Sequence, residues 1–169
     1  DFVTRHISKQ NTVLDVACGY GRLTIPLAQM GYTIQGIDLS PELIKEAKKR
    51  VGKLSVFFTV GSMTALPYRN QQFDYAICMW SSFNHLLTVT EQVQALKEMK
   101  RVASHLIIDM PVHTSNPGTV IQEQINGHQF NNYVHDESTL AMICKEANIV
   151  NYTIQKEKIA RERLVLFAG

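Results

Sequence analysis

The 169-residue sequence lacks the features that mark several specialised classes of protein. Its only cysteines, Cys18, Cys78 and Cys144, are far apart, which fits neither a disulfide framework nor a zinc site and is typical of a reducing compartment. Basic and acidic residues nearly balance, 17 against 15, so charge does not favour a dedicated nucleic-acid binder. No apolar run approaches membrane-spanning length, and no signal peptide is visible. We therefore expect one soluble, cytoplasmic, globular domain over residues 1–169, without membrane contact.

A glycine-rich segment, DVACGYGR, follows the apolar run at residues 12–14 but lacks the residues of two common nucleotide-binding loops. A phosphate-binding P-loop ends in Gly-Lys-Ser/Thr, whereas Gly21 is followed by Arg22 and Leu23. The dinucleotide fingerprint has a third glycine three residues after the second, and neither possible register, ending at Arg22 or Thr24, supplies it. These absences disfavour a P-loop nucleotide, a nicotinamide and a flavin.

Strand-like and helix-like segments alternate through the first two thirds of the chain. Short β-branched or apolar runs predict strands at residues 12–16, 32–39, 54–60, 73–79 and 105–110. Amphipathic spacing and capping residues predict helices at residues 23–30, 41–51 and 88–101. Such alternation is typical of an α/β fold with a parallel sheet.

The last third of the chain has a different pattern. Asn126-Gly127 between runs 119–125 and 128–133 predicts a tight β-hairpin. Asp136 is placed to cap a helix over 137–147. Two final strands, 150–157 and 164–167, are too close in sequence for a crossover helix and must be antiparallel.

The glycine loop fits the pattern acidic–x–small–x–Gly–x–Gly, and with it the sequence resembles the class I S-adenosylmethionine-dependent methyltransferases. Four segments match the motifs of that family in order: VLDVACGYGRLTIPLA, GIDLSPELIKEAKKR, GSMTALPYRNQQFDYAICM and ALKEMKRV. Ala17 stands where the first glycine of the family usually stands. The resemblance implies a doubly wound, mostly parallel, Rossmann-like sheet of seven strands in the order 3-2-1-4-5-7-6. Strand 7 would be antiparallel, helices would cover both faces, and the hairpin at about 119–133 would follow strand 5.

The resemblance also implies S-adenosylmethionine as cofactor, held at the carboxyl ends of the strands. Asp38 is expected to accept the ribose hydroxyls, while Asp15 either braces the loop or contacts the methionine end. Ser62 stands where the family commonly has Asp, so Met63 is the better candidate for an adenine contact. The cofactor-binding residues implied in this way are Asp15, Ala17, Gly19, Tyr20, Gly21, Asp38, Leu39, Ser62, Met63 and Met79.

The acceptor site is expected in MWSSFNHL, after the fourth strand. His85 is the candidate general base, with a packed or capping histidine as the alternative; Trp80 and Asn84 are expected to shape the substrate pocket. His113 and Asp109, at the end of the fifth strand, are expected to face the same opening. No cluster of His, Asp and Glu suggests a metal.

Three functions remain open. The first is methyl transfer to a small-molecule acceptor; the absence of an Asn/Asp-Pro-Pro-aromatic sequence after strand 4 argues against the amino groups of nucleic-acid bases. The second is a cofactor-binding but catalytically silent regulator or scaffold. The third, aminopropyl transfer, is disfavoured because MWSSFNHL has no acidic residue.

Only residues 1–11 precede the first predicted strand, whereas related enzymes usually have N-terminal helices that close over donor and acceptor. We expect either that such a lid segment is missing from this sequence, or that the hairpin supplies the cover or a homodimer contact. In both cases the acceptor side of this chain should be open.

Overall fold

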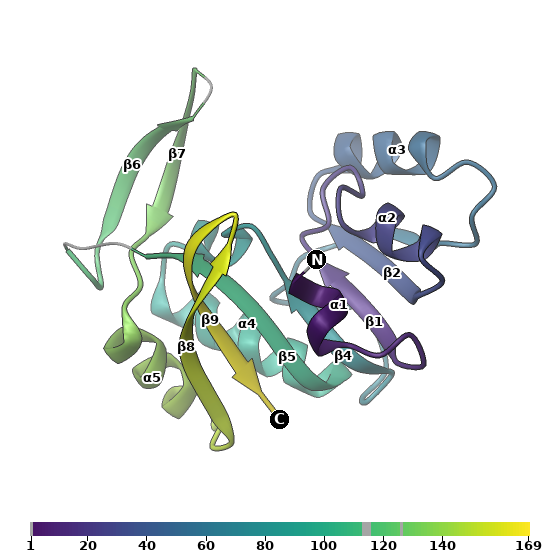
Figure 1. Cartoon of the computed structure of the whole chain (residues 1–169). Coiled ribbons are helices and arrows are strands. Elements are labelled where there is room, and N and C mark those ends of the chain that lie inside the picture. Colours follow the sequence, from purple (N-terminus) through teal and green to yellow (C-terminus); the bar gives the residue numbers. More distant parts are fainter. Residues whose placement is uncertain (1, 113–115, 126) are drawn as a thin grey trace.

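A computed structural model describes residues 2–112, 116–125 and 127–169 and contains a central sheet of seven strands (Figure 1). The strands are β1 (Thr12–Val16), β2 (Thr33–Asp38), β3 (Phe58–Val60), β4 (Phe73–Cys78), β5 (Ala103–Pro111), β8 (Tyr152–Ile159) and β9 (Arg161–Ala168). Their order is β3-β2-β1-β4-β5-β9-β8, in which β9 is antiparallel to both neighbours. In sheet-strand numbering this is 3-2-1-4-5-7-6, so the predicted topology is confirmed.

Helices lie on both faces of the sheet, as predicted. They are α1 (Phe2–His6), α2 (Thr24–Gln29), α3 (Pro41–Arg50), α4 (Val89–Val102) and α5 (Glu137–Glu146), with the 3₁₀ helix η1 (Ser82–His85) after β4. Three predicted caps are present: Ser40 accepts from the Leu43 N–H, Thr88 and Glu91 form a capping box, and Asp136 accepts from the Thr139 N–H. Among the described residues, no helix is long and apolar enough to cross a membrane.

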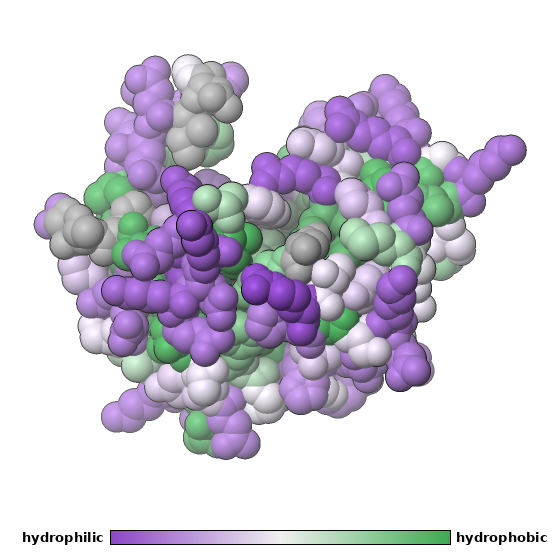
Figure 2. All heavy atoms as spheres, viewed as in Figure 1, coloured by the Kyte–Doolittle hydropathy of each residue, from purple (hydrophilic) through white to green (hydrophobic). Residues whose placement is uncertain are grey.

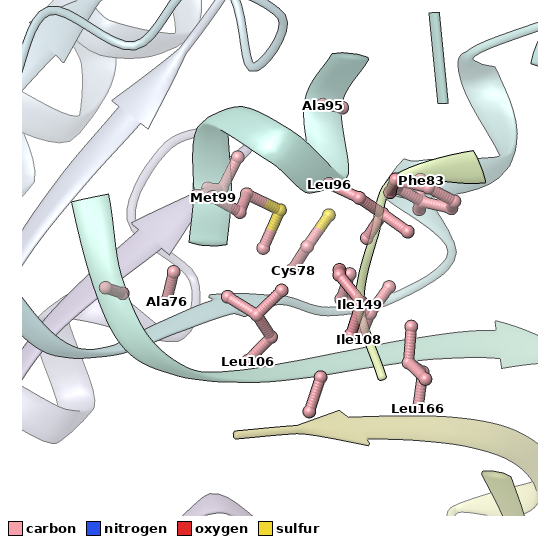
Figure 3. Close-up of a cluster of buried hydrophobic side chains, with 14 of the residues drawn as sticks. Ala76, Cys78, Phe83, Ala95, Leu96, Met99, Leu106, Ile108, Ile149 and Leu166 are labelled. Atoms are coloured by element: carbon pink, nitrogen blue, oxygen red, sulfur yellow. The ribbon is translucent and has the colours of Figure 1, made fainter. Parts of the chain in front are cut away.

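The core has two main layers because successive strand residues point to opposite faces of the sheet. On β5, Leu106 and Ile108 pack against α4 and α5, and Figure 3 shows them beneath Leu96 and Met99 of α4. Ile107 belongs to the opposite cluster, which includes residues of α1 and α2. The central strands are thus covered on both sides, which explains their nearly continuous apolar sequences.

Several element boundaries differ from the sequence-based predictions. β3 begins at Phe58 instead of residue 54, because Leu54 and Val56 turn locally, with the Val56 N–H donating to the Leu54 carbonyl, and pack beside α3. β8 lies two residues later than predicted, β9 is longer than predicted, and the two strands meet at Ala160, which has a left-handed φ of 61°. α1 and η1 were not predicted from the sequence, since both are too short to show helical periodicity.

The predicted hairpin is present as β6 (Val120–Ile125) and β7 (His128–Tyr133), a separate two-stranded sheet that projects from the body of the molecule (Figure 1). Gly127 has the positive φ that the turn requires, 81°; Asn126 lies outside the described residues. The surface is notched between this hairpin and α3 (Figure 2). The carboxyl ends of the parallel strands lie on this side.

Candidate functional site

A cleft of about 390 Å³ lies at the carboxyl ends of β1 and β2, and we call it the donor cleft. Six of the ten residues implied for cofactor binding line it: Ala17, Gly19, Asp38, Leu39, Ser62 and Met63. These residues come from three loops that are separated in sequence. The sheet order places the loops side by side because β2 and β1 are neighbours and β3 pairs with β2.

The loop between β1 and α2 depends on left-handed backbone at Ala17, Gly19 and Gly21, whose φ values are 60°, 57° and 82°. Ala17 adopts this conformation with a side chain, which is uncommon and costs energy that glycine would not. A Cβ at Gly19 would meet nothing within 4 Å, so the loop leaves open space there. A Cβ at Gly21 would lie 2.8 Å from Ile25 Cδ1, so this glycine serves the packing of the loop on α2.

Asp38, at the end of β2, joins two loops at the floor of the donor cleft. Its Oδ2 accepts from the Gly19 N–H at 2.8 Å and its Oδ1 from the Ser40 N–H at 2.9 Å. Each oxygen of a carboxylate can accept more than one hydrogen bond. Asp38 therefore fixes the glycine loop and still has acceptor capacity for two ligand hydroxyls.

Asp15 is buried beneath the glycine loop and does not line the donor cleft. Its Oδ2 accepts from the Thr24 hydroxyl at 2.6 Å, which ties β1 to the start of α2. Burial raises the pKa of the Asp15 carboxyl to about 7, and the nearby charge of Asp38 adds to this effect. Of the two roles expected for Asp15, bracing is the one for which the structure shows a contact.

The remaining residues implied for the cofactor lie outside the lining. The Tyr20 ring is covered by the Arg50 guanidinium, whose carbon lies 4.4 Å from the ring centroid. Gly21 is buried, and Met79 packs in the core layer beside α1. The geometry therefore brings together the ribose and adenine candidates but places Tyr20, Gly21 and Met79 in packing positions.

A second cleft of about 780 Å³ adjoins the first, and we call it the acceptor cleft. It lies between the end of β4, the β6–β7 hairpin and the β8–β9 turn; its lining residues are Arg22, Trp80, Ser81, His85, Pro111, Val112, Glu123, Gln124, Phe130, Asn132, Ile159, Ala160, Arg161 and Arg163. Trp80 is 42% exposed, so the cleft is open to solvent, as expected. The hairpin forms one wall of it, in agreement with the alternative that the hairpin supplies cover.

His85 is the one residue common to both clefts among those described. It ends η1, its side chain is exposed, and its Nδ1 lies 3.4 Å from the Asn131 carbonyl oxygen on the hairpin. Because that oxygen can only accept, Nδ1 is the donor of this contact, and Nε2 of the neutral ring remains free to accept a proton.

Two residues predicted for the acceptor site have other positions. Asn84 is fully buried, lines neither cleft, and donates from Nδ2 to the Tyr133 carbonyl at 2.8 Å, which anchors η1 to the hairpin. The expected contact of Asn84 with substrate therefore has no support in the structure. His113 lies outside the described residues. In the described part of the chain, no group of His, Cys, Asp and Glu could hold a metal ion.

Most of the acceptor cleft was not predicted from the sequence. Its residues Phe130, Arg161 and Arg163 come from the hairpin and the β8–β9 turn, which follow the matched motifs. The run RER at 161–163 was visible in the sequence, but nothing local indicated that it turns toward β4.

Comparison with known proteins identifies the family. A family model described as "Methyltransferase domain" matches residues 13–105, more than half of the chain. The chain belongs to this family. A "Putative methyltransferase YqeM" of Bacillus subtilis is 29% identical over 116 residues, which cover 68% of this chain and 47% of that protein.

Two further comparisons concern proteins with stated substrates or ligands. A "dTDP-3-amino-3,6-dideoxy-alpha-D-glucopyranose N,N-dimethyltransferase" of Streptomyces fradiae is 33% identical over 63% of this chain and 40% of its own length. The structure of "SAM bound CalS10, an amino pentose methyltransferase" from Micromonospora echinaspora matches with a TM-score of 0.71 and 16% identity, covering 94% of this chain and 83% of that one. This methyltransferase domain spans about half or less of the curated relatives it matches.

A buried ion pair holds the turn at the base of the acceptor cleft of this methyltransferase domain. Arg163 Nη2 on β9 lies 2.7 Å from Asp109 Oδ2 on β5, and both side chains are at most 3% exposed. Asp109 also accepts from the Trp80 N–H, and Arg163 donates to the Ser81 hydroxyl. Trp80 and Ser81 have left-handed φ values of 66° and 70°, which are rare for residues other than glycine. The pair therefore stabilises a strained turn.

Breaking this pair should destabilise the protein. Arg163→Met leaves the Asp109 carboxylate buried without its counter-charge, and we expect a loss of roughly 3–5 kcal/mol in the free energy of unfolding. The double substitution Asp109→Asn and Arg163→Met removes both charges and keeps an acceptor for the Trp80 amide. It should therefore recover more than half of that loss. Urea denaturation of the three proteins measures both effects. This account would be contradicted if Arg163→Met left the free energy of unfolding unchanged. It would also be contradicted if the double variant were no more stable than Arg163→Met.

Asp15 should make stability depend on pH. Because its pKa is raised to about 7, the folded state binds a proton that the unfolded state has lost above the ordinary carboxyl pKa. Stability should therefore fall as pH rises from about 4 to about 7, by an amount on the order of 4 kcal/mol, and then level off. Relative to wild type, Asp15→Asn should gain stability across this window, as measured by denaturation at several pH values.

Asp74 provides a control of opposite sign. The Thr12 N–H lowers the pKa of the Asp74 carboxyl, so its contribution is present at neutral pH and is lost in acid. Asp74→Asn should thus lose stability relative to wild type as pH rises from acid to neutral. A difference between Asp15→Asn and wild type that stays constant from pH 4 to 8 would refute the assignment for Asp15.

Proposed function

We propose that this methyltransferase domain binds S-adenosylmethionine in the donor cleft and methylates a small molecule in the acceptor cleft. The observation that carries the proposal is the meeting of the two clefts at His85, with the glycine loop and Asp38 on the donor side. Support comes from the family, from a structural neighbour whose description states bound S-adenosylmethionine, and from a relative named for methylation of an amino sugar.

The donor cleft suits an adenosine joined to an amino acid. Asp38 has lone pairs for both ribose hydroxyls, because each oxygen accepts only one hydrogen bond from the described residues. Met63 offers a polarizable apolar surface to a base, and the space beside Gly19 admits a chain close to the backbone. When bound, S-adenosylmethionine supplies an activated methyl group on a positively charged sulfur.

On the acceptor side the protein chiefly aligns the acceptor. Trp80 and Phe130 provide apolar walls, and the buried ion pair fixes the turn that carries Trp80. A nucleophilic oxygen or nitrogen of the acceptor would take the methyl group as the bond of that carbon to sulfur breaks and S-adenosylhomocysteine leaves as a neutral thioether. The proton that the acceptor gives up would go to His85 Nε2. His85 is well placed for this because it borders both clefts.

Donor binding tests the first half of the proposal. The protein should bind S-adenosylhomocysteine in calorimetry with far higher affinity than NAD. Asp38→Asn should weaken that binding by roughly 1.5–3 kcal/mol, because it removes a charged acceptor from the ribose hydroxyls. Ser40→Ala is the matched control: it removes the cap of α3 but leaves the carboxylate. Unchanged affinity in folded Asp38→Asn, or comparable affinity for NAD, would contradict the proposal.

Methyl transfer tests the second half. With radiolabelled S-adenosylmethionine and the small-molecule fraction of a cell extract, wild type should produce a labelled product. His85→Gln should lower turnover roughly 10²- to 10⁴-fold while S-adenosylhomocysteine binds nearly as before. His128→Gln, an exposed histidine outside both clefts, is the control. If wild type bound S-adenosylhomocysteine but transferred no methyl group, the catalytically silent alternative would be favoured. Full activity in His85→Gln would exclude His85 as the base.

A further inference from the structure

The acceptor cleft contains an excess of positive charge. Arg22 follows the glycine loop, Arg161 begins β9, and Arg163 lies two residues further along that strand; all three line the cleft, with Glu123 as the one lining carboxylate among the described residues. They converge from opposite ends of the chain. The remaining lining is largely apolar or neutral, with Trp80 and Phe130 as the aromatic surfaces.

In the described part of the chain, two of these arginines have no carboxylate partner. Among the described residues, no carboxylate lies within 4 Å of the Arg22 or Arg161 side-chain nitrogens. Glu123 is instead held by the Asn132 amide at 2.8 Å. Arg163 is paired with Asp109, but its buried Nε has no hydrogen-bond partner within the described part of the chain. The cluster thus has donor capacity that the described residues do not use.

Arg22 is also pre-oriented. Its guanidinium carbon lies 3.9 Å from the centroid of the Trp80 ring, so the charged group rests on the indole face. Cation–π contact and stacking hold an arginine in place while its N–H groups remain available as donors in their plane. The planar fork of arginine matches the two oxygens of a carboxylate or phosphate.

Two of these charges, those of Arg161 and Arg163, also repel each other. Burial lowers the pKa of Arg163, and the positive charge of Arg161 lowers it further although Asp109 opposes this, so Arg161 and Arg163 interact electrostatically. Like charges gathered in one cleft without full compensation favour a ligand of opposite charge. An anion bound by Arg161 would offset its repulsion with Arg163, and the free donors of Arg22 could bind the same anion.

We propose that the methyl acceptor is an organic acid: it carries a carboxylate or phosphate group held by Arg22 and Arg161, and its apolar part packs on Trp80 and Phe130. This inference rests on the proposed function, since it names the class of molecule that the acceptor cleft takes. The anionic group is the part of the acceptor that the arginines recognise. His85 lies where the acceptor cleft meets the donor cleft, so it serves the chemistry and not the recognition.

Trp80 gives a direct test because it is the only tryptophan in the sequence and lines the acceptor cleft. Benzoate, phenyl phosphate and the neutral benzamide would be titrated into protein saturated with S-adenosylhomocysteine, with Trp80 fluorescence as the readout. One or both anions should bind roughly 10- to 100-fold more tightly than benzamide. The stronger of the two identifies the preferred group, carboxylate or phosphate, and added salt should weaken only the anions.

Variants separate the cluster from general surface charge. Arg161→Gln should reduce the affinity for the anions to near that of benzamide, and it leaves the stacking of Arg22 on Trp80 intact. Arg69→Gln, which removes an exposed arginine outside both clefts, should change nothing. Equal binding of benzoate, phenyl phosphate and benzamide, or no effect of Arg161→Gln, would overturn the proposal. Calorimetry with S-adenosylhomocysteine keeps the two hypotheses apart: failure to bind it refutes the proposed function, whereas normal binding without anion preference refutes only the acid acceptor.

Discussion

The buried pair of Asp109 and Arg163 is the interaction on which the acceptor side depends. Two charges removed from water cost several kcal/mol each, and such a pair rarely adds more stability than apolar residues of the same size. Here it joins three distant segments: β5, β9 and the turn after β4. Apolar side chains could fill the same space but could not satisfy the Trp80 amide or the Ser81 hydroxyl. The main role of the pair is therefore to fix the conformation of the turn at Trp80 and Ser81, and its net contribution to stability is smaller.

The donor side is held in a different way. There the constraints are backbone conformation and short hydrogen bonds within a local unit: three left-handed residues in the glycine loop, Asp38 across to Gly19, and Asp15 to Thr24. All of these lie in the β1–α2–β2 region, within residues 13–105, which the family model covers. The glycine loop and the Asp38 carboxylate are thus held in place by residues nearby in the sequence, while the acceptor cleft is built from residues far apart in it.

This division explains how far the sequence could predict the structure. Local signals predicted the helix caps at Ser40, Thr88 and Asp136 and the hairpin turn at Gly127. The strand order and most residues of the donor cleft were predicted from four family motifs that occur in the expected order along the chain. The roles of Asn84 and Asp109 depend on partners 49 and 54 residues away, Tyr133 and Arg163, and no local pattern announces them. The predicted start of β3, residue 54, was also wrong because it depends on tertiary packing. Leu54 and Val56 are apolar because they pack beside α3, without strand pairing.

The β6–β7 hairpin has a consequence for how this protein can change. Its two strands pair only with each other in the described structure, and they contribute Glu123, Gln124, Phe130 and Asn132 to the acceptor cleft. Substitutions on this arm alter one wall of that cleft without disturbing a hydrogen bond of the seven-stranded sheet. The hairpin can thus change during evolution or by design and reshape that wall, while the fold and the donor cleft stay as they are.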